Sequence, residues 1–414
     1  MKKLEFFVAS LLVVVSLLFV GCTAEEDAST QQPVICPVDD VFKQVVNASV
    51  DMSYSLFAKV NENAKTDENF MISPLSLMEA LAMLANGAEG ETLSQIHKTM
   101  GFNVGSNEEM NRALNALNSY LSQADVKNKF ALANSVWANL GTKLKSGFID
   151  TNNRWYDAKF FNQQLSTQQT MNDINSWCKK NTDGCIEKFL ESPLGEDSKL
   201  LILNVLYFKG QWSNKFSKEN TRTADFYNID GTKSSVKMMS QNEDFCAYIG
   251  EKMDVVEFPY GNKTFCMDVL LPHEGENLSD CIKDLNKSTM DHIFNSMRVY
   301  KVKVEMPRMQ IKYDTSLKDI LIDMGMVNAF TSDKVELKSM YDDNTPVSNV
   351  KQATYLEVDE EGTKAAAITG VLMDNSIGGN GFTFSMNRPY MFIIREKEAG
   401  AILFMGRVMR EPNS

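Results

Sequence analysis

Apolar residues recur at helical spacing in the first part of the chain after residue 40. In residues 41–60 the side chains of Val46, Val50, Tyr54 and Phe57 fall on one face, which predicts an amphipathic helix. The same spacing predicts further helices, with one strand among them: helices over residues 74–86, 91–100, 107–123, 149–158 and 167–180, and a strand over 130–138.

The pattern changes near residue 199, where short apolar runs replace the helical spacing. Residues 199–209, KLLILNVLYFK, are almost continuously apolar, which is typical of a strand buried on both faces. Asp230-Gly231 predicts a hairpin turn. Further strands are expected over residues 235–240, 245–249, 253–258, 264–271, 299–306, 349–358, 390–394 and 401–408, with helical segments over 278–285 and 315–325. Helices followed by many strands indicate an α+β fold with a large mixed sheet.

The N-terminus resembles an export signal rather than part of the fold. Two lysines precede an apolar run over residues 6–20, which is short for a membrane span and has the length of a signal-peptide core. Gly21-Cys22 follows, as in a bacterial lipobox. We therefore expect residues 1–21 to be a lipoprotein signal peptide and Cys22 to be lipidated. A plain signal peptide with a chance cysteine is the alternative.

Residues 22–40 contain many small and polar residues and two prolines, which predicts a flexible tether. Their beginning, TAEEDAST, resembles the acidic export signals of surface lipoproteins in Bacteroidetes-type bacteria. We expect the protein to be anchored to the membrane of the bacterial cell envelope through its lipid. Exposure on the outer surface of the cell and exposure to the periplasm are the two alternatives. No linker follows, so residues 41–414 are expected to form one domain, although a length of 414 residues alone is compatible with two or three.

Composition and charge exclude several classes of function. Hydrophobic residues make up 43% of the chain and charged residues 23%, as in globular proteins. The net charge of −12 argues against nucleic-acid binding, which requires a basic face. The sequence contains no HExxH, GxSxG or GxxxxGK[ST] motif and has three scattered histidines. We therefore expect no enzyme activity, no cofactor and no metal; a catalytic site assembled from distant residues is the alternative.

The remaining six cysteines form no CxxC pair, so a zinc site is not indicated. Cys178 and Cys185 are the closest pair in sequence. An exported protein can form disulfides, so these two residues form either a bridge or buried thiols.

Residues 357–381, EVDEEGTKAAAITGVLMDNSIGGNG, combine a strand-like start with a run of small side chains. In a strand, Thr363, Ala365 and Ala367 share one face, while Lys364 and Ala366 fall on the other. Small residues on the first face enter a packed sheet without wide pockets, and Lys364 points to water. The segment is therefore either an exposed loop or a strand, and an ordinary alanine-rich helix or linker is the alternative.

Four motifs occur along the chain: NFMISPLSLMEALAMLANGAEGET (69–92), LILNVLYFKGQW (201–212), EEGTKAAAIT (360–369), and FTFSMNRPYMFIIRE (382–396) together with ILFMGRVMREP (402–412). In this order they resemble the serpin family, whose inhibitors insert a cleaved loop into their main sheet. The first resembles the helix that carries the shutter serines, and the second resembles the third strand of the main sheet. The third resembles the hinge of the reactive-centre loop, and the last two segments resemble the C-terminal signature.

This resemblance implies a serpin fold with large mixed sheets, about eight to nine helices and an exposed reactive-centre loop. It assigns roles by matching position. The hinge residues are Glu360, Gly362, Thr363, Ala365, Ala366 and Ala367. The residues of the shutter and of the breach, the upper end of the main sheet, are Ser73, Ser76, Asn204, Trp212, Arg308 and Gln352.

The sequence departs from the family pattern at three positions. Gln352 stands where the shutter usually has a histidine, and Gln can still bridge strands by hydrogen bonds. Lys364 replaces a common glutamate, and Asn387 replaces the usual aspartate before Arg388-Pro389. An ion pair between Glu360 and Arg308 is expected to remain.

The resemblance further implies a suicide mechanism in which the chain is a protease inhibitor and not an enzyme. The partner is a target protease, held as a covalent acyl complex, and the inhibitor acts as a monomer. Counting from Gly362 places the reactive bond between Ser376 and Ile377, within a few residues. No Lys or Arg lies between Lys364 and Arg388, so elastase-, chymotrypsin- or subtilisin-like serine proteases or cysteine proteases are expected targets. A non-inhibitory serpin that acts as a binding or scaffold protein is the alternative.

Overall fold

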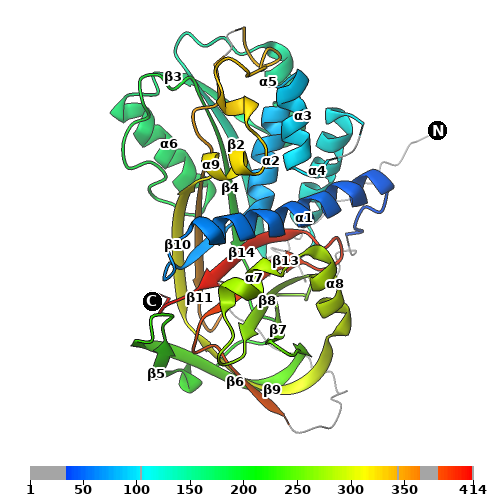
Figure 1. The fold of residues 1–414 in the computed structure, drawn as a ribbon, viewed down its shortest axis with the longest axis vertical. Coiled ribbons are helices and arrows are strands. Elements are labelled where there is room, and N and C mark those ends of the chain that lie inside the picture. The colour runs from blue at the N-terminus through cyan, green and yellow to red at the C-terminus, as the bar shows by residue number, and fades with distance from the viewer. Residues whose placement is uncertain (1–33, 103–104, 343–344, 364–380, 413–414) are drawn as a thin grey trace, which may run out of the picture. The chain divides into compact units, whose positions relative to one another are not determined.

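The computed structural model describes residues 34–102, 105–342, 345–363 and 381–412. Its first part contains four helices and one short strand (Figure 1): α1 (Asp40–Asn63), β1 (Phe70–Ile72), α2 (Pro74–Ala85), α3 (Gly90–Thr99) and α4 (Asn107–Leu121). Asp39, Ser73 and Ser106 each accept a hydrogen bond from a backbone N–H in the first turn of α1, α2 and α4. These caps satisfy donors that have no partner inside the helix, so they fix where each helix begins.

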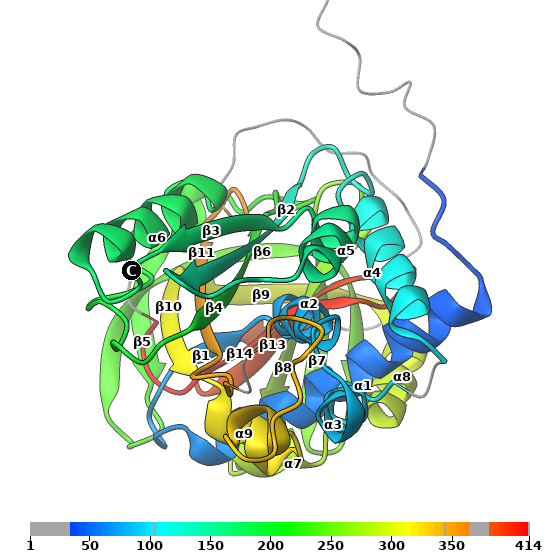
Figure 2. The same ribbon diagram turned by 90° about the horizontal axis from the view of Figure 1, so that it is seen from above.

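A three-stranded sheet follows, together with two helices: β2 (Lys129–Asn139), α5 (Ser146–Tyr156), β3 (Lys159–Gln163), α6 (Gln168–Asn181) and β4 (Leu200–Lys209). Strand β2 is central, antiparallel to β4 and parallel to β3. Helix α6 covers one face of this sheet (Figure 2), where Leu201, Leu203 and Val205 of β4 pack with Ile174. Leu206 of β4 belongs to the main core on the opposite side. The prediction that this strand is buried on both faces is confirmed.

The second half of the chain supplies most of a nine-stranded sheet, in the order β1-β14-β13-β8-β7-β6-β9-β12, with β5 paired to β6. Its strands are β5 (Arg222–Tyr227), β6 (Lys233–Ile249), β7 (Met253–Pro259), β8 (Phe265–Pro272), β9 (Arg298–Pro307), β12 (Phe382–Ser385), β13 (Tyr390–Glu396) and β14 (Ile402–Val408). The connecting helices are η2 (Lys218–Asn220), α7 (Leu278–Lys283) and α8 (Lys287–Ser296). Only β12 and β9 pair in parallel, so the sheet is mixed.

Strands β10 (Met309–Ser316) and β11 (Lys351–Val358) form a two-stranded antiparallel sheet, with α9 (Lys318–Asp323) and η3 (Asn328–Phe330) in the connection between them. Strand β11 lies alongside β4 (Figure 1), but no ladder of backbone hydrogen bonds joins these two strands in the described residues. We call this boundary the β4–β11 division. It separates the three-stranded sheet from the two-stranded sheet.

The α+β architecture predicted from the sequence is confirmed, with nine α-helices among the described residues. Residues 235–249 form one long strand rather than two, because the polar stretch in its middle pairs continuously with β9. Residues 309–316 form β10, whereas the sequence pattern predicts a helix from residue 315. The apolar positions of β10 alternate with exposed polar ones, which is the strand pattern.

Besides β10, four strands and one α-helix were not predicted, namely β1, β3, β5, β12 and α8, as well as the short helices η2 and η3. The four strands have only three to six residues, which leaves little pattern to recognise. In α8 only Met290 and Ile293 are buried, so its apolar face is too small for the helical period to stand out. No helix in the described ranges is long and apolar enough to cross a membrane.

Candidate functional site

Gln352 ties the start of β11 to the N-terminal end of α2. The backbone N–H of Ser73 donates to Gln352 Oε1 at 2.9 Å, and Gln352 Nε2 donates to the Ser73 carbonyl oxygen at 2.8 Å. The Ser73 hydroxyl donates in turn to the carbonyl oxygen of Leu403 in β14 at 2.8 Å. Gln352 therefore bridges two elements through hydrogen bonds, as expected from the chemistry of its amide.

Asn204 ties β4 to the same helix. Its side-chain carbonyl accepts a hydrogen bond from the Ser76 hydroxyl, and its amide nitrogen donates to Asn134 Oδ1 of β2 at 2.5 Å. The structure thus gathers the four predicted shutter residues, Ser73, Ser76, Asn204 and Gln352, around the first turn of α2. We call these four residues the shutter cluster. They hold β4 and β11, the two sides of the division, to one helix.

Two polar residues of this region were not singled out from the sequence. Asn134 lies in β2 and donates to Glu79 Oε2 at 2.9 Å and to the Tyr156 carbonyl oxygen at 3.0 Å. Glu79 is the one charged residue of α2, whose remaining residues are apolar or small. A charge inside such a helix was the available signal, because a buried carboxylate is costly unless it is paired.

At the other end of the division, Gly362 pairs with the residues that follow β4. The chain leaves β11 and reverses in a turn closed by hydrogen bonds between Asp359 and Gly362, and Gly362 then forms an antiparallel bridge with Gln211. Its φ of +134° is rarely adopted by L side chains, and a Cβ at this position would lie 2.3 Å from the Gly210 carbonyl oxygen. Only glycine allows the backbone to lie this close to residues 210–212.

Thr363 is buried beside this glycine, with 5% of its surface exposed. Its backbone N–H donates to the Gly210 carbonyl oxygen at 2.6 Å, and its hydroxyl lies 3.2 Å from the Tyr260 hydroxyl. Trp212 stacks on Tyr260 with ring centroids 4.5 Å apart. The Trp212 indole donates to the Asp359 carbonyl oxygen at 3.0 Å. We call Gly210, Gln211, Trp212 and Tyr260 the hinge seat, because they hold Gly362 and Thr363.

Glu360 and Arg308 form the expected ion pair. The carboxylate is buried, and Arg308 donates to both of its oxygens, at 2.7–3.1 Å. Burial favours protonation of Glu360, but hydrogen bonds from Arg308 and Thr221 outweigh it and lower the pKa of this carboxyl. The neighbouring Glu361 pairs with Lys215 at 2.8 Å. Both glutamates before the hinge glycine are therefore fixed to the body of the protein.

The remaining predicted site residues lie outside the described residues. These are Ala365, Ala366 and Ala367 of the hinge, Lys364, the reactive pair Ser376 and Ile377, and the lipidation residue Cys22. Asn387 stands where the family has aspartate. Its backbone carbonyl oxygen accepts a hydrogen bond from the backbone N–H of Tyr227 at 2.8 Å. Arg388 donates to the Pro272 carbonyl oxygen at 2.9 Å.

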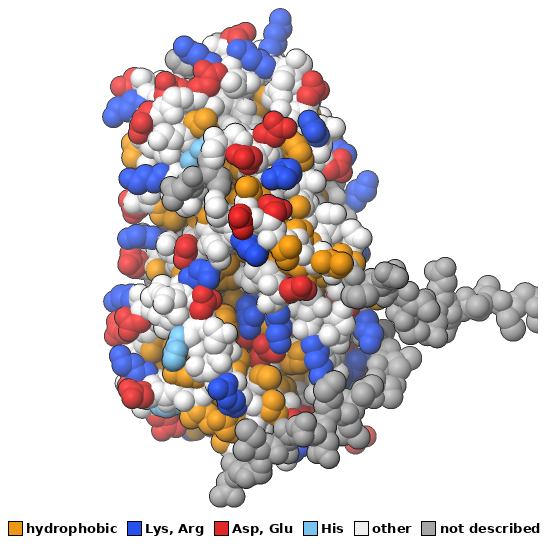
Figure 3. Space-filling model, turned by 90° about the vertical axis from the view of Figure 1, so that its right-hand side faces the viewer, with side chains coloured by type: hydrophobic (Ala, Val, Ile, Leu, Met, Phe, Trp, Pro, Cys, Tyr) orange, Lys and Arg blue, Asp and Glu red, His pale blue; other side chains and the backbone are white. Residues whose placement is uncertain are grey.

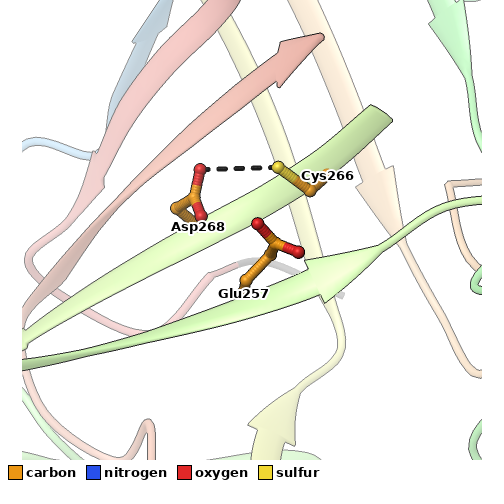
Figure 4. Close-up of side chains that lie close together, drawn as sticks. All are labelled: Glu257, Cys266 and Asp268. Atoms are coloured by element: carbon orange, nitrogen blue, oxygen red, sulfur yellow. Dashed lines mark hydrogen bonds between the residues drawn. The ribbon is translucent and has the colours of Figure 1, made fainter. Parts of the chain in front are cut away.

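One buried cluster has the residue types of a metal site. Glu257, Cys266 and Asp268 place one ligand atom each within 4.8 Å of one another (Figure 4). Arg395 donates to Asp268 at 2.7 Å, and Lys397 donates to Glu257 at 2.5 Å. Two cations therefore already neutralise the two carboxylates, and a metal ion would have to displace them. The cluster is better explained as an ion-pair network.

The thiol of Cys178 is free and buried between α6 and the three-stranded sheet, and burial raises its pKa to about 12. The bridge between Cys178 and Cys185 that the sequence left open is therefore not formed in the structure. On the face drawn in Figure 3, basic and acidic side chains are interspersed rather than gathered into a field of one sign.

Comparison with known proteins identifies the family. The family model described as serpin (serine protease inhibitor) matches residues 47–411. Human antithrombin-III is 30% identical over 397 residues, covering 93% of this chain and 86% of its own length. Human leukocyte elastase inhibitor is 30% identical over 377 residues, covering 88% of this chain and 99% of its own.

Solved structures agree with this result. The thermophilic serpin tengpin in its native state superposes with a TM-score of 0.80 at 28% identity, covering 92% of this chain and 97% of its own. Human thyroxine-binding globulin has the same fold, with a TM-score of 0.82 at 23% identity, covering 90% of this chain and 100% of its own. From the family model, the relatives and the fold together, the chain belongs to the serpin family.

Proposed function

We propose that the protein inhibits a protease by cleavage of its reactive-centre loop and insertion of that loop into the β4–β11 division. The observation that carries this proposal is the position of Gly362, which a turn from Asp359 places antiparallel to Gln211, just after β4. The first residues of the hinge therefore already run in the direction that an inserted strand would take. An inserted strand would continue from Thr363 between β4 and β11.

The proposed reaction begins as ordinary proteolysis. The nucleophile of the protease attacks the carbonyl carbon of the reactive bond, the new amine leaves, and an acyl-enzyme ester or thioester remains. The freed hinge then inserts between β4 and β11 and carries the attached protease with it. About a dozen inserted residues, at about 0.5–1.5 kcal/mol net for each hydrogen bond, supply on the order of 10 kcal/mol. This energy is comparable with the whole stability of a domain and is enough to distort a catalytic site.

The composition of the loop supports a target outside the trypsin class. No Lys or Arg lies between Lys364 and Arg388, and trypsin-like pockets require a basic residue before the scissile bond. We place the reactive bond at Ser376–Ile377, within a few residues, and assign the target to elastase-, chymotrypsin- or subtilisin-like serine proteases or to cysteine proteases.

The test is incubation with one protease of each class, followed by denaturing electrophoresis and N-terminal sequencing of the released C-terminal peptide. We expect an SDS-stable complex with at least one non-tryptic protease and a released peptide that begins at or near Ile377. A trypsin-like protease serves as the control and should form no complex. If every protease cuts the loop and leaves as free, active enzyme, the inhibitory proposal is wrong.

A second candidate is a serpin that binds or positions a partner without inhibiting a protease. Two residues favour it: Gln352 in the shutter cluster and Lys364 in the hinge, both of which depart from the family pattern. Thyroxine-binding globulin, which has the same fold, has been solved in complex with thyroxine, so the fold is compatible with ligand binding. The melting temperature before and after loop cleavage separates the two candidates. A large rise indicates insertion, and an unchanged value favours a binding protein.

We also propose that the protein is monomeric and is anchored to the cell envelope by a lipid on Cys22. The sequence of residues 1–22 supports the anchor, with the apolar core followed by Gly-Cys. Expression in a bacterium with labelled palmitate should give a labelled protein in the membrane fraction, and Cys22→Ser should remove both the label and the membrane association. A wild-type chain that is never labelled would rule out the anchor without affecting the inhibitory proposal.

A further inference from the structure

Glu79 is a buried acid without a cation. It lies in α2, its side chain is fully buried, and its two oxygens accept hydrogen bonds from the amides of Asn118 in α4 and Asn134 in β2. Among the buried carboxylates that the structure describes, Glu257, Asp268 and Glu360 have basic partners. Asp125 and Glu396 resemble Glu79 in having no ion pair among the described residues. No ion pair reaches Glu79 from any residue that the structure describes.

The elements around α2 supply no charge that would replace such a partner. Figure 2 looks nearly along α2, and the elements that contact this helix are α1, α3, α4, α5, β4 and β14. Asn118 faces Glu79 from α4, Asn134 faces it from β2, and Tyr156 is the titratable neighbour from α5. The Tyr156 hydroxyl donates to Asn111 Oδ1 at 2.5 Å, so it is engaged elsewhere. The side-chain oxygen Oδ1 of Asn118 is itself buried, with no hydrogen-bond partner among the described residues.

A continuous set of hydrogen bonds connects Glu79 with the shutter cluster. The carboxylate accepts from Asn134 Nδ2, Asn134 Oδ1 accepts from Asn204 Nδ2, and Asn204 Oδ1 accepts from the Ser76 hydroxyl. Glu79 and Ser76 belong to α2, whereas Asn134 and Asn204 belong to β2 and β4. The two end residues of this set therefore lie in the helix, and its two middle residues lie in the three-stranded sheet that borders the β4–β11 division. The set binds the helix to this sheet at both of its ends.

The charge state of Glu79 bears directly on how firmly the sheet packs on the helix. Burial raises the pKa of Glu79 to about 7, and the two amide hydrogen bonds offset this effect only in part. The ionised carboxylate is therefore costly in the closed arrangement. Any movement of β2 and β4 away from α2 that admits water relieves this cost, because water solvates the charge. The protonated carboxyl gains much less from the same movement.

We propose that Glu79 is a proton-controlled latch between α2 and the β3–β2–β4 sheet. When the carboxyl is protonated, the sheet stays docked on α2; when it is ionised, the docking loosens and the β4–β11 division opens more readily. The latch is a property of the closed protein, and only its consequence for the rate of loop insertion rests on the proposed inhibitory function. Under this proposal the β4–β11 division would open to an inserting strand more readily at mildly alkaline pH than at mildly acidic pH.

The test uses the purified full chain without any protease. Amide exchange of the middle of β4, residues 203–206, is followed at pH 6 and pH 8 for the wild type and for Glu79→Gln, with the intrinsic exchange rate at each pH divided out. A group that titrates near neutral pH and is hydrated on opening should lower the wild-type protection about tenfold between these pH values. Glu79→Gln, which keeps the shape and cannot ionise, should show no such fall.

Thermal unfolding gives a second measurement that does not depend on assigning amides. We expect the wild-type Tm to fall by about 2 °C between pH 6 and 8.5 in excess of any change in Glu79→Gln. Subtracting the variant removes contributions from the three histidines, which are common to both proteins. Glu108→Gln, which removes an exposed charge from α4, is the matched control and should behave as the wild type.

The two measurements decide between clear outcomes. The latch is overturned if protection in β4 and the Tm of the wild type do not depend on pH, or if Glu79→Gln keeps the wild-type dependence. If Glu79→Gln does not fold, the wild-type exchange profile alone still decides, because the proposal requires a fall in protection that is confined to β2 and β4 and levels off above about pH 7. A protein that shows the latch but inhibits no protease would contradict the proposed function and leave the latch standing.

Discussion

The backbone N–H of Thr363 donates to the carbonyl oxygen of Gly210 at 2.6 Å, so the hinge of the loop is bound to the residues that follow β4. Thr363 is also buried, and its hydroxyl contacts Tyr260. These contacts exist in the uncleaved chain. If the loop inserts, its first pairing is therefore already made, and insertion extends a strand rather than nucleating one.

Replacing Thr363 with arginine should turn the proposed inhibitor into a substrate. The arginine would enter the buried space beside Tyr260, where a charge without a partner is costly. We expect the hinge to leave its seat and insertion to slow by on the order of tenfold or more. The measurement is the ratio of SDS-stable complex to cleaved free inhibitor with a responsive protease.

Thr363→Ser is the matched control for this substitution. It keeps the hydroxyl that contacts Tyr260 and removes one methyl group, so the complex ratio should stay close to that of the wild type. An unchanged ratio in Thr363→Arg would mean that position 363 does not face the buried side during insertion.

Gly362→Ala tests the close approach at the same place. The added Cβ would lie 2.3 Å from the Gly210 carbonyl oxygen, and the φ of +134° disfavours any L side chain. Both effects act on the hinge seat, so we expect a loss of about 1–3 kcal/mol of local stability there. Limited proteolysis after Glu360 and Glu361 by a glutamate-specific protease should become faster. Gly184→Ala is the control, since it also has a positive φ but has open space around the added Cβ. Equal cleavage rates in Gly362→Ala and in the wild type would contradict the proposed role of the seat.

The sequence predicted the general fold because each large element carries its own pattern. The apolar period of α1, the cap at Ser106 and the continuous apolar run of β4 are local signals, and the structure has all three elements. Strand β10 was missed because its end overlaps a helix-like stretch. Its identity depends on pairing with β11, which lies more than thirty residues away.

Some residues of the candidate site were likewise identified from the sequence, whereas others were found only in the structure. Ser73, Ser76 and Asn204 were identified because each stands in a motif that resembles the serpin family, and Gln352 was identified by its place ten residues before the hinge glycine. Glu79 lies within the motif over residues 69–92, but the resemblance assigns it no role, and Asn134 lies outside every motif. Their hydrogen bond joins residues 55 positions apart in the chain, and neither side chain reveals its partner in the sequence. Contacts of this kind follow from the fold and could not be predicted from the local pattern.

Arg308→Gln should destabilise the upper end of the division. It leaves Glu360 buried without its cation, and breaking such a pair from one side costs about 3–5 kcal/mol when both partners are buried. The Arg308 side chain is 39% exposed, so we expect a smaller loss, about 2–3 kcal/mol. Denaturant unfolding measures this loss. Arg222→Gln is the control, because its pair with Glu305 is formed by a guanidinium that is 62% exposed, and a loss as large as in Arg308→Gln would contradict this expectation.

The same ion pair predicts how stability depends on pH in the acid range. The pKa of Glu360 is lowered in the folded protein because the hydrogen bonds from Arg308 and Thr221 outweigh burial. A lowered folded pKa means that the contribution to stability is present above the unfolded value of about 4.3 and is lost as the pH falls through the folded value. The difference in unfolding free energy between the wild type and Glu360→Gln should therefore shrink below about pH 4. A difference that stays constant from pH 6 to pH 3 would show that ionised Glu360 contributes nothing specific.

The last prediction concerns the amide that stands where the family usually has a histidine. Gln352 satisfies the buried backbone N–H of Ser73 and donates to the Ser73 carbonyl oxygen, which also accepts from Leu77 in α2. Gln352→Ala should leave the N–H without a partner and cost about 1–3 kcal/mol. Gln352→His should recover part of this loss, because a neutral imidazole can serve either the donor or the acceptor of Ser73 but not both at once. Denaturant unfolding at pH 8 should therefore rank the wild type first, Gln352→His second and Gln352→Ala last. A histidine variant more stable than the wild type would mean that the two hydrogen bonds of Gln352 are not what holds β11 to α2.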